Sequence, residues 1–203
     1  MSYSDFSLKR IKQEFNLNFI ENKDFFQETE EADISEYLRM TLDYNVPLAL
    51  AINTEKARSE LIIANILLEL KRQLNDQISL FPGVNLDVDK SRGLSGFCDY
   101  ILSKSSEQFY LSAPVLAIVE AKNDQVTNGL GQCIAEMIAA RIFNDREGNS
   151  IGSIYGAVTT GSAWKFLKYE NENDVVYIDR PEYYIADVRK IMGILVKMMR
   201  QEA

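Results

Sequence analysis

The stretch PVLAIVEAK, residues 114–122, decides the fold. An unbroken apolar run of this length is typical of a central β-strand that is covered on both faces. Residues i and i+2 of a strand share a face, so Glu120 and Lys122 are predicted to project side by side where the strand ends. The same Glu-x-Lys spacing recurs at residues 21–23 and 69–71, but only residues 120–122 close an apolar strand. The alternative interpretation is a strand end with two solvated charges.

A third candidate residue, Asp99, lies within the expected strand Phe97–Ser103. Aspartate is depleted inside strands because its short polar side chain favours turns and helix caps. A carboxylate that is buried in a strand needs a partner, and a metal ion is one that suits it. The alternative is an aspartate on an edge strand that faces water.

Two expected helices supply further candidates. Glu60 shares a helix face with apolar residues one and two turns on, so it belongs either to a site or to an ordinary i,i+4 pair with Lys56. Gln132 lies in the first turn of the helix that follows the Glu-x-Lys strand, and Glu136 lies one turn further on the same face. For Gln132 and Glu136 the alternative is that both face solvent.

The order of expected elements is helix, three strands, helix, strands, helix, which predicts an α/β fold with a mixed central sheet flanked by helices. Residues 1–50 are expected to form an N-terminal extension packed on the core, and residues 51–203 a single α/β unit. The elements expected from hydrophobic periodicity and turn residues are a short helix over Ser35–Asp43 that Pro47 ends, a helix over Thr54–Leu70 with Thr54 as its N-cap, strands at Val84–Val88, Phe97–Ser103 and Val115–Val119, a helix over Asn128–Phe143, strands at Ser153–Thr160, Trp164–Tyr169 and Val175–Ile178, and a helix over Tyr184–Met199.

The composition excludes several kinds of chemistry. Histidine is absent from the 203 residues, so Ser-His-Asp and Cys-His catalysis and histidine zinc sites are excluded. Cys98 and Cys133 have no close cysteine partner, which fits a reducing compartment. No apolar run reaches the roughly 18 residues of a membrane span, and residues 1–10 have no signal core, so we expect a cytoplasmic protein without a membrane partner.

The order of these features resembles the PD-(D/E)xK, or restriction-endonuclease-like, nuclease superfamily. The features are an acidic residue on a helix, an aspartate on a hairpin strand, an apolar strand ending in Glu-x-Lys and a helix with glutamine. The resemblance covers residues 60–169 and departs from the motif at Cys98, where a proline often stands. It implies an αβββαβ core, with Asp99 and Glu120 binding Mg²⁺ (or Mn²⁺). It also implies that Lys122 orients or activates water, and that Glu60 and Gln132 support the site.

The function that this resemblance implies is metal-dependent hydrolysis of DNA. The net charge of −8 counts against it, because phosphate contacts require lysine and arginine. A local basic patch would have to supply them, with Lys104, Arg141, Lys165 and Lys168 as candidates. The alternatives are a non-catalytic binding or assembly module on the same fold and a small-molecule hydrolase that uses carboxylates. The sequence is compatible with a homodimer but does not decide the oligomeric state.

Overall fold

The sheet is built around β4 (Val115–Ala121), the strand that the apolar run predicts. All of its residues are buried in the computed structural model, which describes residues 1–200. β4 pairs antiparallel with β3 (Phe97–Ser103) and parallel with β5 (Ser153–Thr159). A strand with neighbours on both sides and helices on both faces has no contact with water, which explains its apolar sequence.

The complete sheet is mixed, and it confirms the predicted α/β class. Its strand order is β1-β7-β6-β5-β4-β3-β2, and β8 pairs with β6 beside this path. The parallel pairs are β4 with β5 and β1 with β7, and the other pairs are antiparallel. The remaining strands are β1 (Asn18–Ile20), β2 (Ser79–Asn85), β6 (Ala163–Glu170), β7 (Val175–Ile178) and β8 (Tyr183–Tyr184).

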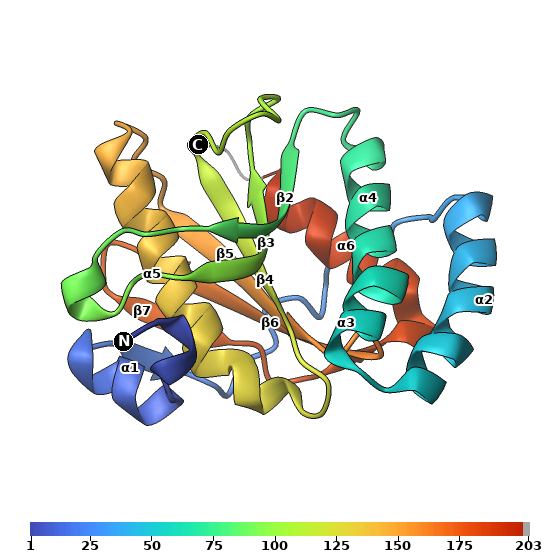
Figure 1. Ribbon diagram of the computed structural model, residues 1–203, viewed down its shortest axis with the longest axis horizontal. Helices are drawn as coiled ribbons and strands as arrows, with labels where there is room; N and C mark the ends of the chain where they lie inside the picture. Colours follow the sequence, from blue (N-terminus) through green and yellow to red (C-terminus); the bar gives the residue numbers. More distant parts are fainter. Residues whose placement is uncertain (201–203) are drawn as a thin grey trace.

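Helices cover both faces of this sheet (Figure 1). α5 (Leu130–Arg146) connects β4 to β5 and packs on one face, and α6 (Val188–Met199) packs on the other. α3 (Glu55–Arg58) continues through a π-helical turn at Ser59–Ile63 into α4 (Ala64–Gln73), which contacts β2 and α6. The remaining helices are α1 (Leu8–Glu14), α2 (Glu36–Ile52) and short 3-10 turns at Tyr3–Asp5, Lys90–Arg92, Val126–Gly129 and Ile185–Asp187.

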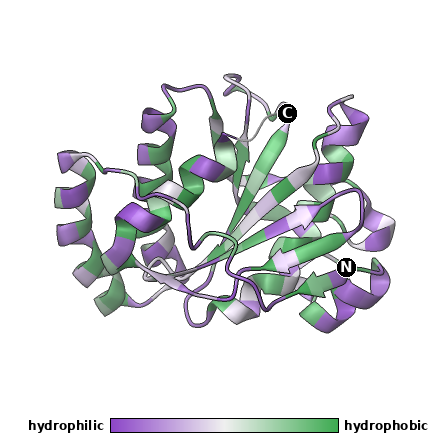
Figure 2. Cartoon of the chain, turned by 180° about the vertical axis from the view of Figure 1, so that it is seen from behind, coloured by the Kyte–Doolittle hydropathy of each residue, from purple (hydrophilic) through white to green (hydrophobic). Residues whose placement is uncertain are grey.

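Hydrophobic residues concentrate in the central strands, which are largely green in Figure 2. Trp164 and Phe166 of β6 are fully buried, and the Trp164 indole N–H donates to the carbonyl of Gly161 (3.2 Å). The predicted N-cap is confirmed, because the Thr54 hydroxyl accepts a hydrogen bond from the Ala57 N–H (3.1 Å). Among residues 1–200, no helix combines the length and apolar character that crossing a membrane requires.

Two boundaries differ most from the sequence-based expectation, and the helix expected from Tyr184 begins at Val188. The prediction that Pro47 ends a helix is wrong, because α2 runs through it to Ile52. Burial of Leu42 and Ala49 on either side of Pro47 outweighs the roughly 3 kcal/mol that a proline costs inside a helix. The second strand of the chain is β2 at Ser79–Asn85, so the alternating residues predicted at Val84–Val88 lie at and beyond its end.

The N-terminal residues contribute directly to the sheet and its cover. β1 pairs in parallel with β7 at the sheet edge. The Tyr3 hydroxyl donates to the backbone carbonyl of Leu86, and Tyr3 is buried. Gly131 at the start of α5 has no room for a Cβ, because the Phe6 carbonyl occupies that space. Residues 1–20 thereby hold the first turns of α5, where candidate Gln132 lies.

Candidate functional site

Glu120 and Lys122 lie together at the end of β4. The Glu120 side chain is 1% exposed and that of Lys122 is 19% exposed. The Lys122 ammonium donates to Glu120 Oε1, and the other carboxylate oxygen, Oε2, is buried without a hydrogen-bond partner. The interpretation of Glu120 and Lys122 as two solvated charges is therefore wrong. One oxygen of the buried carboxylate remains available to a group that the chain itself does not supply.

Asp99 reaches the same point from β3. The β3–β4 ladder ends with Tyr100 opposite Val119, and one further step in this register places Asp99 beside Glu120. There Asp99 Oδ2 accepts a hydrogen bond from the backbone N–H of Ala121 (2.8 Å). The Asp99 side chain thus satisfies the backbone N–H of Ala121, where the β3–β4 ladder stops. This hydrogen bond brings the second carboxylate of the predicted pair to the end of β4.

α5 completes a hydrogen-bonded chain of side chains. Lys122 Nζ donates to Gln132 Oε1 (3.3 Å), and Gln132 Nε2 donates to Glu136 Oε1 (3.1 Å). Glu136 is fully buried, and its Oε2 has no hydrogen-bond partner. The solvent-facing interpretation is wrong for Glu136. We refer to Asp99, Glu120, Lys122, Gln132 and Glu136 as the Glu120 cluster.

A glycine makes room for the lysine. A Cβ at Gly129, the residue before α5, would lie 2.6 Å from Val158 Cγ1 and 3.1 Å from Lys122 Cε. Real Cβ atoms do not approach other carbons this closely, so a larger residue would displace one of the two side chains. The lysine stem therefore lies directly against the turn that starts α5, within reach of Gln132.

Glu60 is placed outside this hydrogen-bonded chain. Its side chain is 64% exposed and lies 3.7 Å from Lys56 Nζ, which is the i,i+4 pair that the sequence left as its alternative role. The helix carboxylate whose charge acts on the cluster is Glu55, in the first turn of α3. Its field raises the pKa of both Glu120 and Lys122. Sequence reasoning did not single out Glu55 as part of a site.

Burial dominates the electrostatics of the cluster. It raises the pKa of Glu120 to about 8; the charge of Asp99 adds to this increase, and Lys122 opposes it. Burial and the charge of Glu120 also raise the pKa of Glu136 well above its ordinary value. Burial lowers the pKa of Lys122, but the charge of Glu120 and its hydrogen bond outweigh this, so the net pKa is raised. A charged Glu120 therefore favours the ammonium form of Lys122, whereas burial works against the charged form of both glutamates.

The donor set fits one hard cation with open coordination positions. Mg²⁺ takes oxygen ligands and usually binds through one or two carboxylates plus waters. Asp99 and Glu120 offer two carboxylates, and the partnerless Glu120 Oε2 is a buried oxygen that a cation would satisfy. Among residues 1–200, no group of three or more His, Cys, Asp or Glu residues is arranged to hold a metal ion. Two carboxylates suffice for Mg²⁺ but not for a closed structural site.

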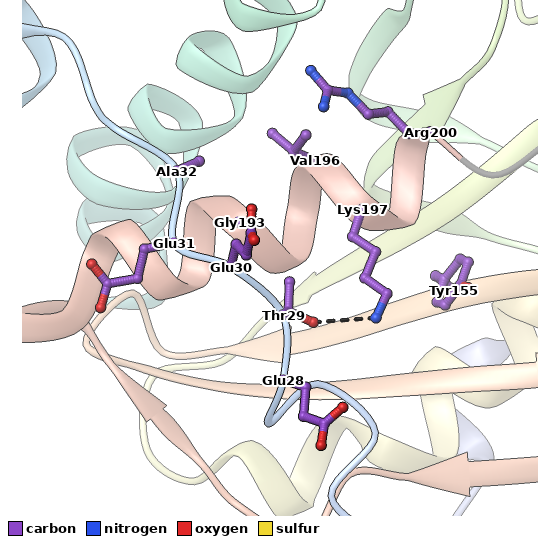
Figure 3. A pocket seen from close by; sticks show the side chains of 10 residues that line it. All are labelled: Glu28, Thr29, Glu30, Glu31, Ala32, Tyr155, Gly193, Val196, Lys197 and Arg200. Atoms are coloured by element: carbon purple, nitrogen blue, oxygen red, sulfur yellow. Dashed lines mark hydrogen bonds between the residues drawn. The ribbon is translucent and has the colours of Figure 1, made fainter.

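A pocket of about 600 Å³ lies elsewhere, between residues 28–32 and α6 (Figure 3). Lys197 crosses it and donates to Thr29 Oγ1 (3.4 Å), and Tyr155 of β5 lines its floor. The neighbouring Gly156 contacts Met137 of α5, so the pocket and the cluster lie on opposite faces of the sheet. None of the Glu120 cluster lines this pocket. This pocket is therefore not the enclosed apolar pocket that a small-molecule hydrolase would place at the Glu120 cluster.

Comparison with known proteins does not assign this chain to a family. Neither the protein-family models nor the curated proteins that were searched contain a match to this chain. The function is therefore argued from the chemistry of the Glu120 cluster.

Proposed function

We propose that this chain is a metal-dependent nuclease of the PD-(D/E)xK type that hydrolyses DNA phosphodiester bonds with Mg²⁺ or Mn²⁺. One observation carries the proposal. Glu120 is a buried carboxylate with one oxygen unpartnered, and it lies beside Asp99 and in contact with the Lys122 ammonium at a strand end. Two carboxylates and a lysine in this arrangement match the ligands and the second positive charge that phosphodiester hydrolysis requires.

In this proposal Asp99 and Glu120 hold the cation. When bound, Mg²⁺ lowers the pKa of a coordinated water and neutralises charge that develops on the phosphate. Lys122 contributes a fixed positive charge, since its pKa is raised and it does not release its proton readily. We therefore assign Lys122 to orienting the attacking water and stabilising negative charge, and not to removing a proton.

Gln132 and Glu136 position the lysine. Gln132 accepts from the Lys122 ammonium with its oxygen and donates to Glu136 with its nitrogen, so its amide orientation is set at both ends. Glu136 is enclosed by α5 and the sheet and has little freedom to move. A lysine held at two oxygens loses less entropy when substrate binds, and this favours catalysis.

The four cations that the sequence suggested for a contact with DNA have partners within the chain. Arg141 is hydrogen-bonded to Tyr169 and paired with Asp174 (3.1 Å), and Lys168 is paired with Glu170 (2.7 Å). Lys165 donates to the backbone carbonyl of Arg180 (2.8 Å), and Lys104 also has an interaction partner. The two ion pairs reduce the positive charge that Arg141 and Lys168 offer to phosphate.

A further cation lies where α1 meets the connection between β2 and β3. The exposed Arg92 guanidinium lies 4.2 Å from the ring centre of Phe15, which packs on the buried Phe6 at 6.0 Å. The neighbouring Arg10 is paired with Glu14 (2.6 Å). Arg92 is therefore the better candidate here for a contact with phosphate.

The proposal is tested with purified protein on supercoiled plasmid, single-stranded DNA and RNA. We expect nicking or degradation of DNA with Mg²⁺ or Mn²⁺, none with EDTA, and little turnover with Ca²⁺, whose looser coordination positions water less well. Asp99→Asn should lose both cleavage and Mg²⁺ binding measured by calorimetry, because a charged ligand is removed. Asp124→Asn is the matched control, since Asp124 is exposed and only two residues beyond Lys122.

The alternative function is a binding or assembly module without catalysis. It is favoured by the raised pKa of Glu120 and Glu136, because carboxyl groups that remain protonated can be buried without any metal. Absence of metal-dependent cleavage on all three nucleic acids, together with no Mg²⁺ or Mn²⁺ binding, would replace the nuclease proposal with this module.

A further inference from the structure

The outward face of α2 is an apolar stripe. α2 buries Leu38, Leu42 and Ala49 against the rest of the molecule and is the outermost helix in Figure 1. Its opposite face carries residues that follow the alternating spacing of three and four that lets one helix pack along another. We define the α2 stripe as these exposed residues: Tyr37, Met40, Tyr44, Pro47, Leu48 and Ala51.

The exposure of this stripe is unusual. Tyr37 is 60% exposed, Met40 62% and Tyr44 76%, and no charged residue interrupts them along the stripe. The surface continues onto α4, where Leu68 is 48% exposed and Arg72 lies 4.8 Å from the ring centre of Tyr37. The side chains together expose on the order of 600 Å², at the upper end of the roughly 300–600 Å² of the largest apolar patch on a typical monomer.

We propose that a second copy of this chain covers the α2 stripe, with the two α2 helices antiparallel and the two-fold axis beside Tyr44. The spacing is the first argument. Met40 and Leu48 lie one helical turn on either side of Tyr44, and Tyr37 and Ala51 lie two turns on either side. An antiparallel copy therefore places Met40 opposite Leu48, Tyr37 opposite Ala51 and Tyr44 opposite its own counterpart, as a self-complementary interface requires.

Area and helix direction support the same occupant. The charged residues in the first half of α2 pair with one another, Arg39 with Glu36 and with Asp43, so they leave the stripe itself uncharged. An antiparallel pair also opposes the two helix dipoles. The stripe approaches the roughly 800 Å² per partner of a stable interface, and residues beside it would supply the rest. This inference is independent of the proposed nuclease activity.

The test combines the mass of the protein in solution with site-specific cross-linking between copies. We expect sedimentation equilibrium to give twice the chain mass at micromolar concentration, and Tyr44→Arg to give the single-chain mass. Tyr184→Arg is the control, because Tyr184 is 54% exposed but lies on β8, away from the stripe. Tyr44→Cys should form a disulfide between copies on mild oxidation, whereas Phe109→Cys, at a fully exposed loop position, should not. Cys98 and Cys133 are buried and do not compete.

Tyr44 is an exposed position, so circular dichroism should show that both Tyr44 variants retain the fold. A single-chain mass for the unmodified protein up to hundreds of micromolar would overturn the proposal. A dimer that Tyr44→Arg leaves intact and that Tyr44→Cys does not cross-link would overturn it as well, since the interface would then lie elsewhere.

Discussion

The pattern Glu-x-Lys occurs at residues 69–71 in α4 and at residues 120–122 at the end of β4. The two glutamates are buried almost equally. Glu69 is 3% exposed and Glu120 is 1% exposed. Their surroundings differ in hydrogen bonding. Both Glu69 oxygens accept hydrogen bonds, from the backbone N–H and hydroxyl of Ser35 (both 2.8 Å), whereas Glu120 Oε2 has no partner.

This difference reverses the direction of the pKa shift. Burial raises the pKa of Glu69, but the hydrogen bonds from Ser35 and Gln73 and the charge of Arg72 lower it below its ordinary value. For Glu120 burial and Asp99 prevail over Lys122, and the pKa rises to about 8. Glu69 is a structural carboxylate that ties the start of α2 to α4. Burial therefore does not by itself identify a functional carboxylate; an unsatisfied oxygen does so better.

The largest contrast should be between the two lysines. Lys122→Ala should reduce DNA cleavage by about 100-fold or more, because a preorganised charge beside the reacting phosphate is lost. Mg²⁺ binding should be nearly retained, since lysine is not a ligand. Lys71→Ala should leave cleavage unchanged, because Lys71 donates to the Ile78 carbonyl (2.6 Å) on α4's side of the fold. Equal rates for the two variants under single-turnover conditions would contradict the assignment of Lys122.

The two glutamates should differ in how much each contributes to the free energy of unfolding. Glu69→Gln should lower the free energy of unfolding by about 1–3 kcal/mol, because an amide N–H₂ would replace one of the oxygens that accept from Ser35. Glu120→Gln should change it by less than about 1 kcal/mol at pH 5, because the raised pKa leaves this carboxyl largely neutral there and the amide oxygen still accepts from Lys122. Urea unfolding of metal-free protein at pH 5 measures both. A loss at Glu120 as large as that at Glu69 would show that Glu120 is structural.

The finest contrast should be in the slope of stability against pH. A carboxyl group with a raised pKa binds more protons when folded, so it weakens the folded state as pH rises from about 4.5 towards about 8. Glu120→Gln should flatten that decline by at most about 1 kcal/mol for each pH unit. Glu69 has the opposite sign, because its pKa is lowered and its contribution is lost as pH falls through the folded value. If the stability of wild type and of Glu120→Gln in EDTA changed in parallel with pH, a raised pKa of Glu120 in the folded state would be excluded.

Much of the fold was predictable because its signals are local. The run that forms β4, the N-cap at Thr54 and the strands β6 and β7 each follow from neighbouring residues. The outcome at Pro47 was not predictable, because packing on both sides of the proline determines it. The pairing of β1 with β7 depends on residues far apart in the chain, which hydrophobic periodicity does not report.

The candidate site was predictable in part for the same reason. Glu120, Lys122, Asp99 and Gln132 follow from strand and helix positions, and the structure brings them together. Glu60 had an equally good local pattern, but its helix turns it towards solvent. Glu136 had a usable signal, since it is the only charged residue in the apolar run between Cys133 and Ala140.

The pairing of β1 with β7 also bears on the order in which the protein assembles during synthesis. Asn18–Ile20 leaves the ribosome long before Val175–Tyr177, its partner in the sheet. Until then the β1 segment has no strand to join, although Tyr3 and Phe6 can already contact Leu86 and the start of α5. The β1 segment is therefore expected to join the sheet last, leaving only a three-residue strand at that edge and little backbone for another chain to pair with.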